Sequence, residues 1–182
     1  MANKKKILQI LYKIQHDSPC KSNTDIMYLL KILYFSDKYH LRHYGITASG
    51  DNYYAMGRGP VASLAFDILR DPCAVTLLSE YAVEIPPQYN DELSESVNEA
   101  IDFALRTFGE YNCWKLSDIS HKYPEWKKHE KELKERKNNR VQMDVKDFFD
   151  DPEDYNWLSK YKLSEDPFKE DKEFLQLLKE DL

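Results

Sequence analysis

The 182-residue sequence contains only five glycines and three cysteines, and it has no long uninterrupted apolar run. The longest apolar stretch, residues 27–35, is broken by Lys31 and is far shorter than the roughly 20 residues that a bilayer-spanning helix needs. Cys20, Cys73 and Cys113 are widely spaced and form no CxxC pair, which argues against a disulfide framework or a zinc knuckle. The sequence therefore predicts a cytoplasmic protein that does not enter a membrane.

Basic residues are fewer than acidic ones. The chain has 32 acidic and 26 basic residues, a net charge of −6, which does not favour nucleic-acid binding by the whole molecule. Residues 138–182 hold 13 acidic and 7 basic residues and so carry the whole excess, whereas residues 1–137 hold 19 of each. This asymmetry predicts a domain over 1–137 and an acidic C-terminal extension over 138–182, which either binds a partner or is strapped onto the domain.

Helical periodicity dominates the sequence and predicts a mainly α fold. Ser22 and Asp25 have the spacing of a capping box at the start of a long helix, which Gly45 ends. Asn90 is the expected N-cap of a second clear helix, and Gly109 closes it. The spacing of apolar residues and helix breakers predicts helices over 7–14, 24–43, 60–70, 90–109, 112–120, 124–137 and, after an irregular stretch, 171–182.

Most of the glycines cluster between residues 45 and 59, where they surround the aromatic segment 52–56. This segment is too short for a helix and predicts an extended strand between tight turns. Residues 80–85 are the candidate partner strand, and Gly59-Pro60 is expected to open the next helix. The predicted architecture is a compact multi-helix domain with a small two-stranded β element, followed by the acidic extension.

Three sequence motifs resemble those of a known family. They are Leu30 to Leu41 with Tyr44-Gly45, then Asp51 with Tyr54-Ala55-Met56 and Gly59-Pro60-Val61, and finally Leu116 to His121 with Trp126. In this order and spacing they resemble the Panacea domain of SocA-like antitoxins, which are often labelled phage-associated proteins in bacterial genomes. The resemblance covers residues 5–135, and residues 46–49 replace the arginine or proline that usually precedes the second motif.

The resemblance implies a function as well as a fold. It implies an antitoxin of a type II toxin–antitoxin system, which neutralises a toxin encoded in the same operon by direct protein contact. For the SocA member it also implies delivery of the toxin to a protease, so a protease is a second implied partner. The family is one of binding proteins, and we therefore expect no enzyme.

The polar residues of the motifs lack the spacing that catalysis or metal binding requires. His40 and His43 share a helix face, but no cysteine or carboxylate has matching spacing, so His40 is expected to be a hydrogen-bonded core or half-buried residue. Ser120 and His121 are adjacent only in sequence, which supplies neither a base in position nor an oxyanion hole, and His121 is expected to bond a freed carbonyl. We predict no catalytic residue, no metal and no cofactor.

Asp37 follows the apolar face of the long predicted helix, so it is expected to be partly buried. A buried carboxylate needs a partner, and Arg42, Arg58 and His121 are the candidates. The alternative is a general acid or base, which would need a nucleophile or a second carboxylate beside it.

Two surfaces are candidates for binding the toxin. The first is a cleft where the 37–41 stretch, the glycine-rich turn and the third motif meet, and its residues are Asp37, Tyr39, His40, Tyr54, Arg58, His121 and Trp126. The second is the segment 144–155, in which an exposed Phe148-Phe149 pair flanked by carboxylates would anchor on a basic toxin. The alternative for this segment is a strap folded onto its own domain.

A winged-helix-like DNA-binding regulator is the alternative from another functional class. Residues 124–140 contain eight basic residues, counting His129, against four acidic ones, and such a helix can contact phosphates. The same pattern is typical of a solvated helix face with pairs such as Glu130 and Lys134. The zero net charge of residues 1–137 argues against DNA binding.

Overall fold

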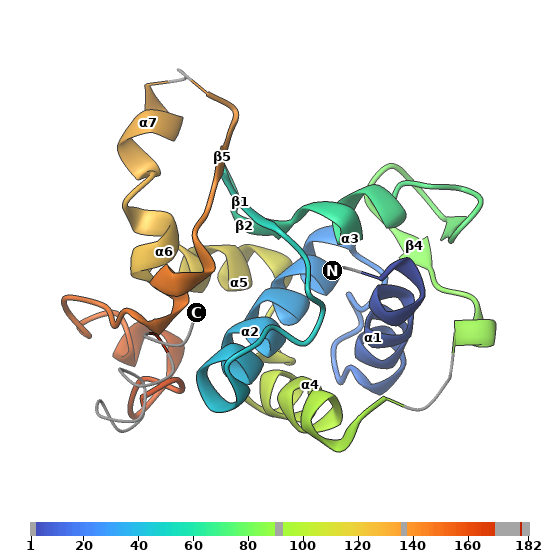
Figure 1. The fold of residues 1–182 in the computed structure, drawn as a ribbon, viewed down its shortest axis with the longest axis horizontal. Coiled ribbons are helices and arrows are strands. Elements are labelled where there is room, and N and C mark those ends of the chain that lie inside the picture. Colours follow the sequence, from blue (N-terminus) through green and yellow to red (C-terminus); the bar gives the residue numbers. More distant parts are fainter. Residues whose placement is uncertain (1–2, 90–92, 136–137, 170–178, 180–182) are drawn as a thin grey trace.

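The 19-residue helix α2 (Ile26–Tyr44) runs through the middle of the molecule, and the other long helices lie around it (Figure 1). The computed structural model describes residues 3–89, 93–135, 138–169 and 179 of the chain. The other elements are α1 (Lys4–Asp17), β1 (Tyr53–Met56), β2 (Gly59–Ala62), α3 (Ser63–Ile68), β3 (Thr76–Leu77), β4 (Val83–Glu84), the 3-10 helix η1 (Pro87–Tyr89), α4 (Glu95–Phe108), α5 (Cys113–Ser120), α6 (Pro124–Lys127), α7 (Glu130–Lys134), β5 (Arg140–Gln142) and the 3-10 helices η2 (Val145–Phe149) and η3 (Ser159–Tyr161). The mainly α fold with a small β element is confirmed.

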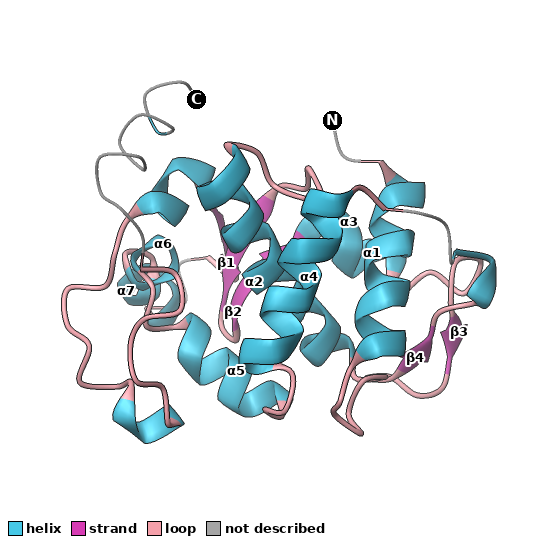
Figure 2. Ribbon diagram, turned by 90° about the horizontal axis from the view of Figure 1, so that it is seen from below, coloured by secondary structure: helices cyan, strands magenta, loops and turns pink. Residues whose placement is uncertain are grey.

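Helix α2 is buried on nearly all sides, since 15 of its 19 residues are buried. It contacts α1 and α4 on one side and α5 on another, and Figure 2 shows α1, α2 and α4 side by side. Its end at Gly45 is confirmed, because this glycine adopts φ 74° and donates its N–H to the carbonyl of Leu41. Its start differs from the prediction: Asp25 is itself the N-cap and accepts from the N–H of Tyr28, so Ser22 forms no capping box with it.

The sheet differs from the predicted two-stranded element in both composition and partners. Strand β1 lies between β2 and β5, antiparallel to both, so the third strand comes from beyond residue 137. Gly59 and Pro60 do not open a helix but form part of β2, where Pro60 lies opposite Ala55. Gly59 has φ +102°, which a helix excludes, and an edge strand tolerates the missing N–H of proline. The helix therefore begins later, at Ser63.

The expected pairing of residues 80–85 with β1 is wrong. Only Val83 and Glu84 form a strand, β4, and it pairs with β3 in a separate hairpin at one end of the molecule (Figure 2). The backbone of Val83 also donates to the carbonyl of Thr24, and that of Ile26 to Tyr81. These two hydrogen bonds attach the loop to the start of α2. The local sequence does not predict them, because the two segments are far apart in the chain.

The later helices follow the prediction with two exceptions. The first is that α4 begins at Glu95 and not at residue 90, because residues 93 and 94 are not helical. Helix α4 ends at Gly109, and Asn112 caps α5 by accepting from the N–H of Lys115, as expected. The described N-cap of α4 is Ser94; the predicted cap Asn90 lies outside the described residues. The single charged helix predicted over 124–137 is instead two short helices, because the N–H of His129 bonds three residues back to Trp126 and interrupts the α pattern.

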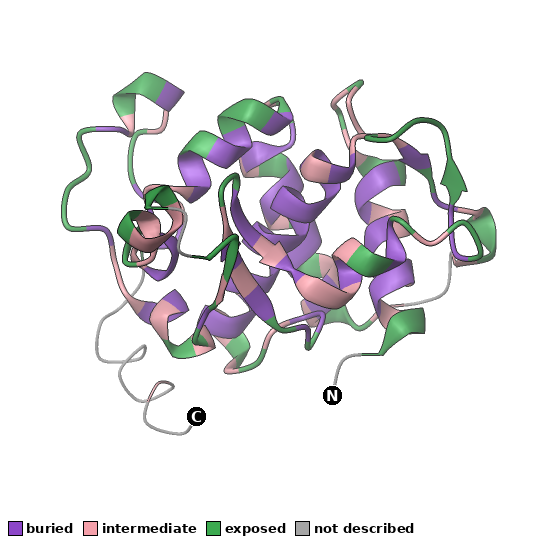
Figure 3. Ribbon diagram, turned by 90° about the horizontal axis from the view of Figure 1, so that it is seen from above, coloured by how far each residue is buried: buried purple, intermediate pink, exposed green. Residues whose placement is uncertain are grey.

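The C-terminal segment contributes to the core. Phe148 and Phe168 are almost completely buried, and Phe149 is 5% exposed, so the expected exposed Phe148-Phe149 pair is wrong. The segment descends from β5 and lies against α6 (Figure 1), and its helix η2 contacts both α2 and α6. Buried residues are concentrated in the helices at the middle of the molecule (Figure 3). The helix predicted over 171–182 lies outside the described residues, apart from Lys179.

None of the helices in the described ranges has both the length and the apolar character of a membrane-spanning segment.

Candidate functional site

Asp37 lies in the interior and is completely buried. Its carboxylate accepts hydrogen bonds from the N–H of Ser49 at 2.8 Å, from the Ser49 hydroxyl and from the Tyr53 hydroxyl at 2.8 Å. Burial raises the pKa of Asp37 to about 6, although these hydrogen bonds oppose the shift. The expected arginine or histidine partner is wrong: Asp37 joins α2 to Ser49 in the loop before β1 and to Tyr53 of β1.

Tyr39 and His40 lie on the part of α2 that faces α4. The Tyr39 ring stacks on Phe103 at a centroid distance of 4.2 Å, and its hydroxyl donates to Glu99. His40 bonds the carbonyl of Ile46 through Nδ1 at 2.6 Å, and its Nε2 lies 3.1 Å from the Ser96 hydroxyl. Burial lowers the pKa of His40. The interpretation of His40 as a hydrogen-bonded core residue is confirmed.

His121 and Trp126 form a stacked pair with ring centroids 3.7 Å apart. The Trp126 indole donates to the carbonyl of Met56 at 2.9 Å and so joins α6 to the end of β1. Burial and, to a smaller extent, the nearby Lys31 lower the pKa of His121 to about 4, so the ring is neutral at neutral pH. The expected bond from His121 to a freed carbonyl is replaced by this stacking, and its Nε2 has no partner within the described residues.

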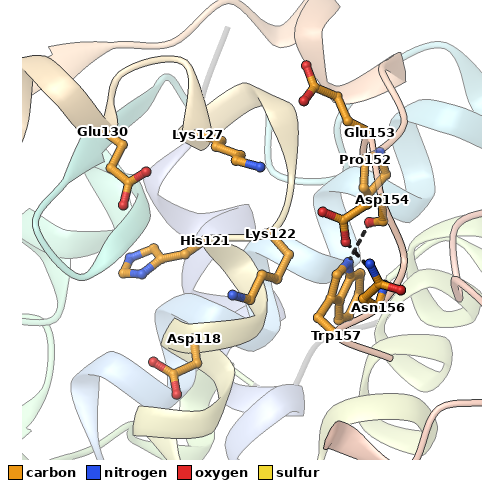
Figure 4. A pocket seen from close by; sticks show the side chains of 10 residues that line it. All are labelled: Asp118, His121, Lys122, Lys127, Glu130, Pro152, Glu153, Asp154, Asn156 and Trp157. Atoms are coloured by element: carbon orange, nitrogen blue, oxygen red, sulfur yellow. Dashed lines mark hydrogen bonds between the residues drawn. The ribbon is translucent and has the colours of Figure 1, made fainter. Parts of the chain in front are cut away.

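A cavity of about 450 Å³ lies beside His121. Figure 4 shows His121, Lys122 and Asp118 across the cavity from the segment 152–157. Charges of both signs are mixed around it, with Lys122 and Lys127 among carboxylates, and Trp157 is turned to donate to the carbonyl of Asp154. The lining is thus mostly polar, and Pro152 and Trp157 are its apolar members.

Tyr54 and Arg58 belong to the β1–β2 hairpin and face different surroundings. The Arg140 guanidinium from β5 lies 3.8 Å over the Tyr54 ring and covers it. The Arg58 guanidinium lies 4.5 Å over the ring of Trp114, while its carbonyl accepts from the Ser117 hydroxyl. Arg58 is thus held at a surface with an exposed aromatic side chain.

This surface is the wall of a second, larger cavity of about 650 Å³, hereafter the groove. Trp114 and Tyr81 line it and remain 58% and 63% exposed. The complete lining is Asp25, Ile26, Met27, Leu30, Lys31, Met56, Gly57, Arg58, Val61, Phe66, Arg70, Glu80, Tyr81, Cys113 and Trp114. Neither this groove nor the cavity beside His121 is lined by Asp37, Tyr39 or His40, so the predicted residues are not brought into one cleft.

Lys31 is the most unusual residue of the groove because it is a cation that is only 1% exposed. Its ammonium donates to the carbonyl of Pro60 at 2.7 Å, and burial lowers its pKa to about 7. In the sequence Lys31 is visible only as an interruption of an apolar run, and no motif points to Trp114 or Tyr81 as binding residues. The one signal for Lys31 was its position in a helix stretch that is otherwise apolar.

Much of the chain that forms the groove matches a known protein family. Residues 29–127, more than half of the chain, match the model of the family described as antitoxin SocA-like, Panacea domain. The chain belongs to the Panacea family. Neither the curated proteins nor the solved structures contain a match to it.

The Panacea match spans most of the groove. It begins inside α2 and ends with α6, so it includes Lys31, the β1–β2 hairpin and Trp114. The C-terminal segment that packs on α2 and α6 follows it. Membership of a SocA-like antitoxin family points to an antitoxin role and to a toxin as partner.

Proposed function

We propose that this protein is the antitoxin of a type II toxin–antitoxin pair, and that it binds its toxin through the groove. The observation that supports the proposal is the exposed pair Trp114 and Tyr81 on the rim of an apolar groove inside the family match. Tryptophan, tyrosine and arginine supply most of the binding energy in protein interfaces, and clustered exposed aromatics mark such interfaces. The toxin encoded in the same operon would meet it in the cytoplasm.

The mechanism that this geometry supports is occlusion by a preformed surface. The floor of the groove is α2, which is buried on nearly all sides, and one wall is the hairpin that Ser117 and Trp126 hold in place. A rigid floor lowers the ordering cost of binding, so more of the contact energy appears as affinity. The toxin would be neutralised because the segment seated here is no longer available to it.

Two alternatives have less support. Two lysines of the predicted DNA-binding helix form ion pairs, Lys128 with Asp147 and Lys134 with Glu130, which reduces the charge available for phosphate contacts. Delivery of the toxin to a protease is implied only by the resemblance to the SocA member.

Coexpression with the adjacent gene product tests the proposal. We expect the protein to rescue growth and to copurify with that product, and Trp114→Ala to weaken the complex about 30-fold, as loss of a hot-spot tryptophan does. Tyr44→Ala is the matched control, because Tyr44 is an exposed aromatic that lies outside both the groove and the segment 144–155. Failure of the unmodified protein to rescue growth or bind would refute the antitoxin proposal, and full binding by Trp114→Ala would remove the groove from it.

A further inference from the structure

We infer that the toxin segment seated in the groove carries a carboxylate next to an apolar side chain. This inference rests on the proposed function and specifies the chemistry of the partner at the same site. It follows from three features of the groove: cations without a carboxylate partner, acidic residues that are already engaged, and apolar walls.

The cations are Lys31, Arg58 and Arg70. In the described ranges of the chain, no ion pair within 4.0 Å joins any of the three to a carboxylate. Arg58 lies over Trp114, and Arg70 lies 5.3 Å over the ring of Phe66. A guanidinium stacked on a ring keeps its N–H edge open, and that edge matches the two oxygens of a carboxylate.

The two acidic residues of the lining already lie against polar groups of this chain. Asp25 caps α2 by accepting from the N–H of Tyr28 at 3.0 Å, and the Cys113 thiol lies 3.7 Å from its other oxygen. The Glu80 carboxylate lies beside the Tyr81 hydroxyl and raises the pKa of that tyrosine. Arg58 and Arg70 balance the charges of Asp25 and Glu80, so the excess positive charge of the groove is that of Lys31, on a chain whose net charge is −6. With a pKa of about 7, Lys31 is about half protonated at neutral pH.

The position of Lys31 increases the effect of this excess. Its ammonium lies in the floor with a backbone carbonyl as hydrogen-bond partner, and a buried cation without a countercharge costs several kcal/mol. The low-dielectric surroundings also screen its field less than water would. An incoming carboxylate would favour the protonated form of Lys31, so it would be attracted by the floor as well as by the two arginines on the rim.

The apolar walls define the rest of the occupant. Ile26, Leu30 and Val61 supply aliphatic surface, and the two methionines Met27 and Met56 adapt to different side-chain shapes. An aliphatic or aromatic side chain of the toxin would fill this space, with the carboxylate beside it directed at the arginines. A segment of only polar residues would leave the walls exposed, and a basic segment would be repelled.

Titration of the full-length protein with the purified toxin, in a series of salt concentrations, tests the inference. We expect Arg58→Gln and Arg70→Gln each to weaken binding about 10-fold at low salt, and the double variant to bind with a flatter salt dependence. Arg106→Gln is the matched control, since Arg106 is an exposed arginine on α4 that does not line the groove. Arg58→Lys should fall between Arg58→Gln and the unmodified protein, because it keeps the charge but loses the fork geometry.

The outcomes separate this inference from the proposed function. If Trp114→Ala weakens toxin binding while both arginine variants bind like the control, the groove remains the site and the carboxylate inference is overturned. If the arginine variants change only self-association of the protein, the occupant is a second copy and the inference is again overturned. If the unmodified protein does not bind the toxin at all, the proposed function fails and this inference fails with it.

Discussion

Several charged side chains of α2 are buried, and their partners come from distant parts of the chain. Lys38 pairs with Glu125 at 2.7 Å with both side chains fully buried, and the Tyr34 hydroxyl donates to the same carboxylate. Arg42, also buried, donates to the carbonyl of Phe148 and to Asp151. On an amphipathic helix such positions are normally solvated, so sequence pattern alone assigns them to the wrong face.

We expect Glu125→Gln to lower the free energy of unfolding by about 3–5 kcal/mol, because it leaves the Lys38 ammonium buried without its countercharge. Urea unfolding measures the loss. Glu130→Gln is the control: Glu130 pairs with Lys134 at the surface, and we expect a change below about 1 kcal/mol. Adding Lys38→Met to Glu125→Gln should restore part of the loss. Equal stability of Glu125→Gln and Glu130→Gln would contradict the importance of the buried ion pair.

At the scale of elements, the β1–β2 hairpin shows how one backbone angle changes the assignment of a segment. Gly59 has φ +102°, and a Cβ there would clash with the Ser120 hydroxyl and lie 2.7 Å from the Lys31 ammonium. Close approach of the hairpin to α2 and α5 thus requires glycine at this position. The Gly59-Pro60 pair is also a common helix start, and the local sequence does not separate the two interpretations.

Gly59→Ala should therefore destabilise the protein by about 2 kcal/mol or more, through backbone strain and the steric clash. Gly57→Ala, in the same hairpin, meets no atom within 4 Å and should change stability by less than about 1 kcal/mol. Thermal unfolding of the pair provides the comparison. A loss at Gly57 as large as that at Gly59 would show that flexibility of the whole hairpin, and not the space at one position, is what matters.

At the scale of the whole molecule, acidic side chains of the C-terminal segment contact polar groups of residues 1–137. Asp151 pairs with Arg42, Asp147 pairs with Lys128, and Asp166 accepts from the Tyr123 hydroxyl. These acidic residues therefore serve internal contacts. We propose that residues 138–169 are a strap folded onto residues 1–137, the second of the two alternatives that the charge asymmetry left open.

We expect Phe148→Ala to cost about 3–5 kcal/mol of stability, because its fully buried ring packs edge-on against Tyr34 and Tyr53. Tyr155→Ala, at an exposed aromatic of the same segment, should cost less than about 1 kcal/mol. Both are measured by urea unfolding. Deleting residues 138–182 should abolish cooperative unfolding, and a truncated protein with an unchanged transition would refute the strap.

The sequence by itself determined the features that depend on near neighbours in the chain. The 3.6-residue periodicity and Gly109 located α4, Asn112 marked the start of α5, Gly45 marked the end of α2, and three motifs identified the family. Only the tertiary structure decided which distant segments meet: β5 beside β1, Phe148 beside Arg42, and Trp114 with Arg58 at the rim of the groove. The physical reason is that hydrogen bonds and periodicity within a helix are set over a few residues, whereas strand partners, buried ion pairs and grooves form between segments whose approach leaves no local pattern.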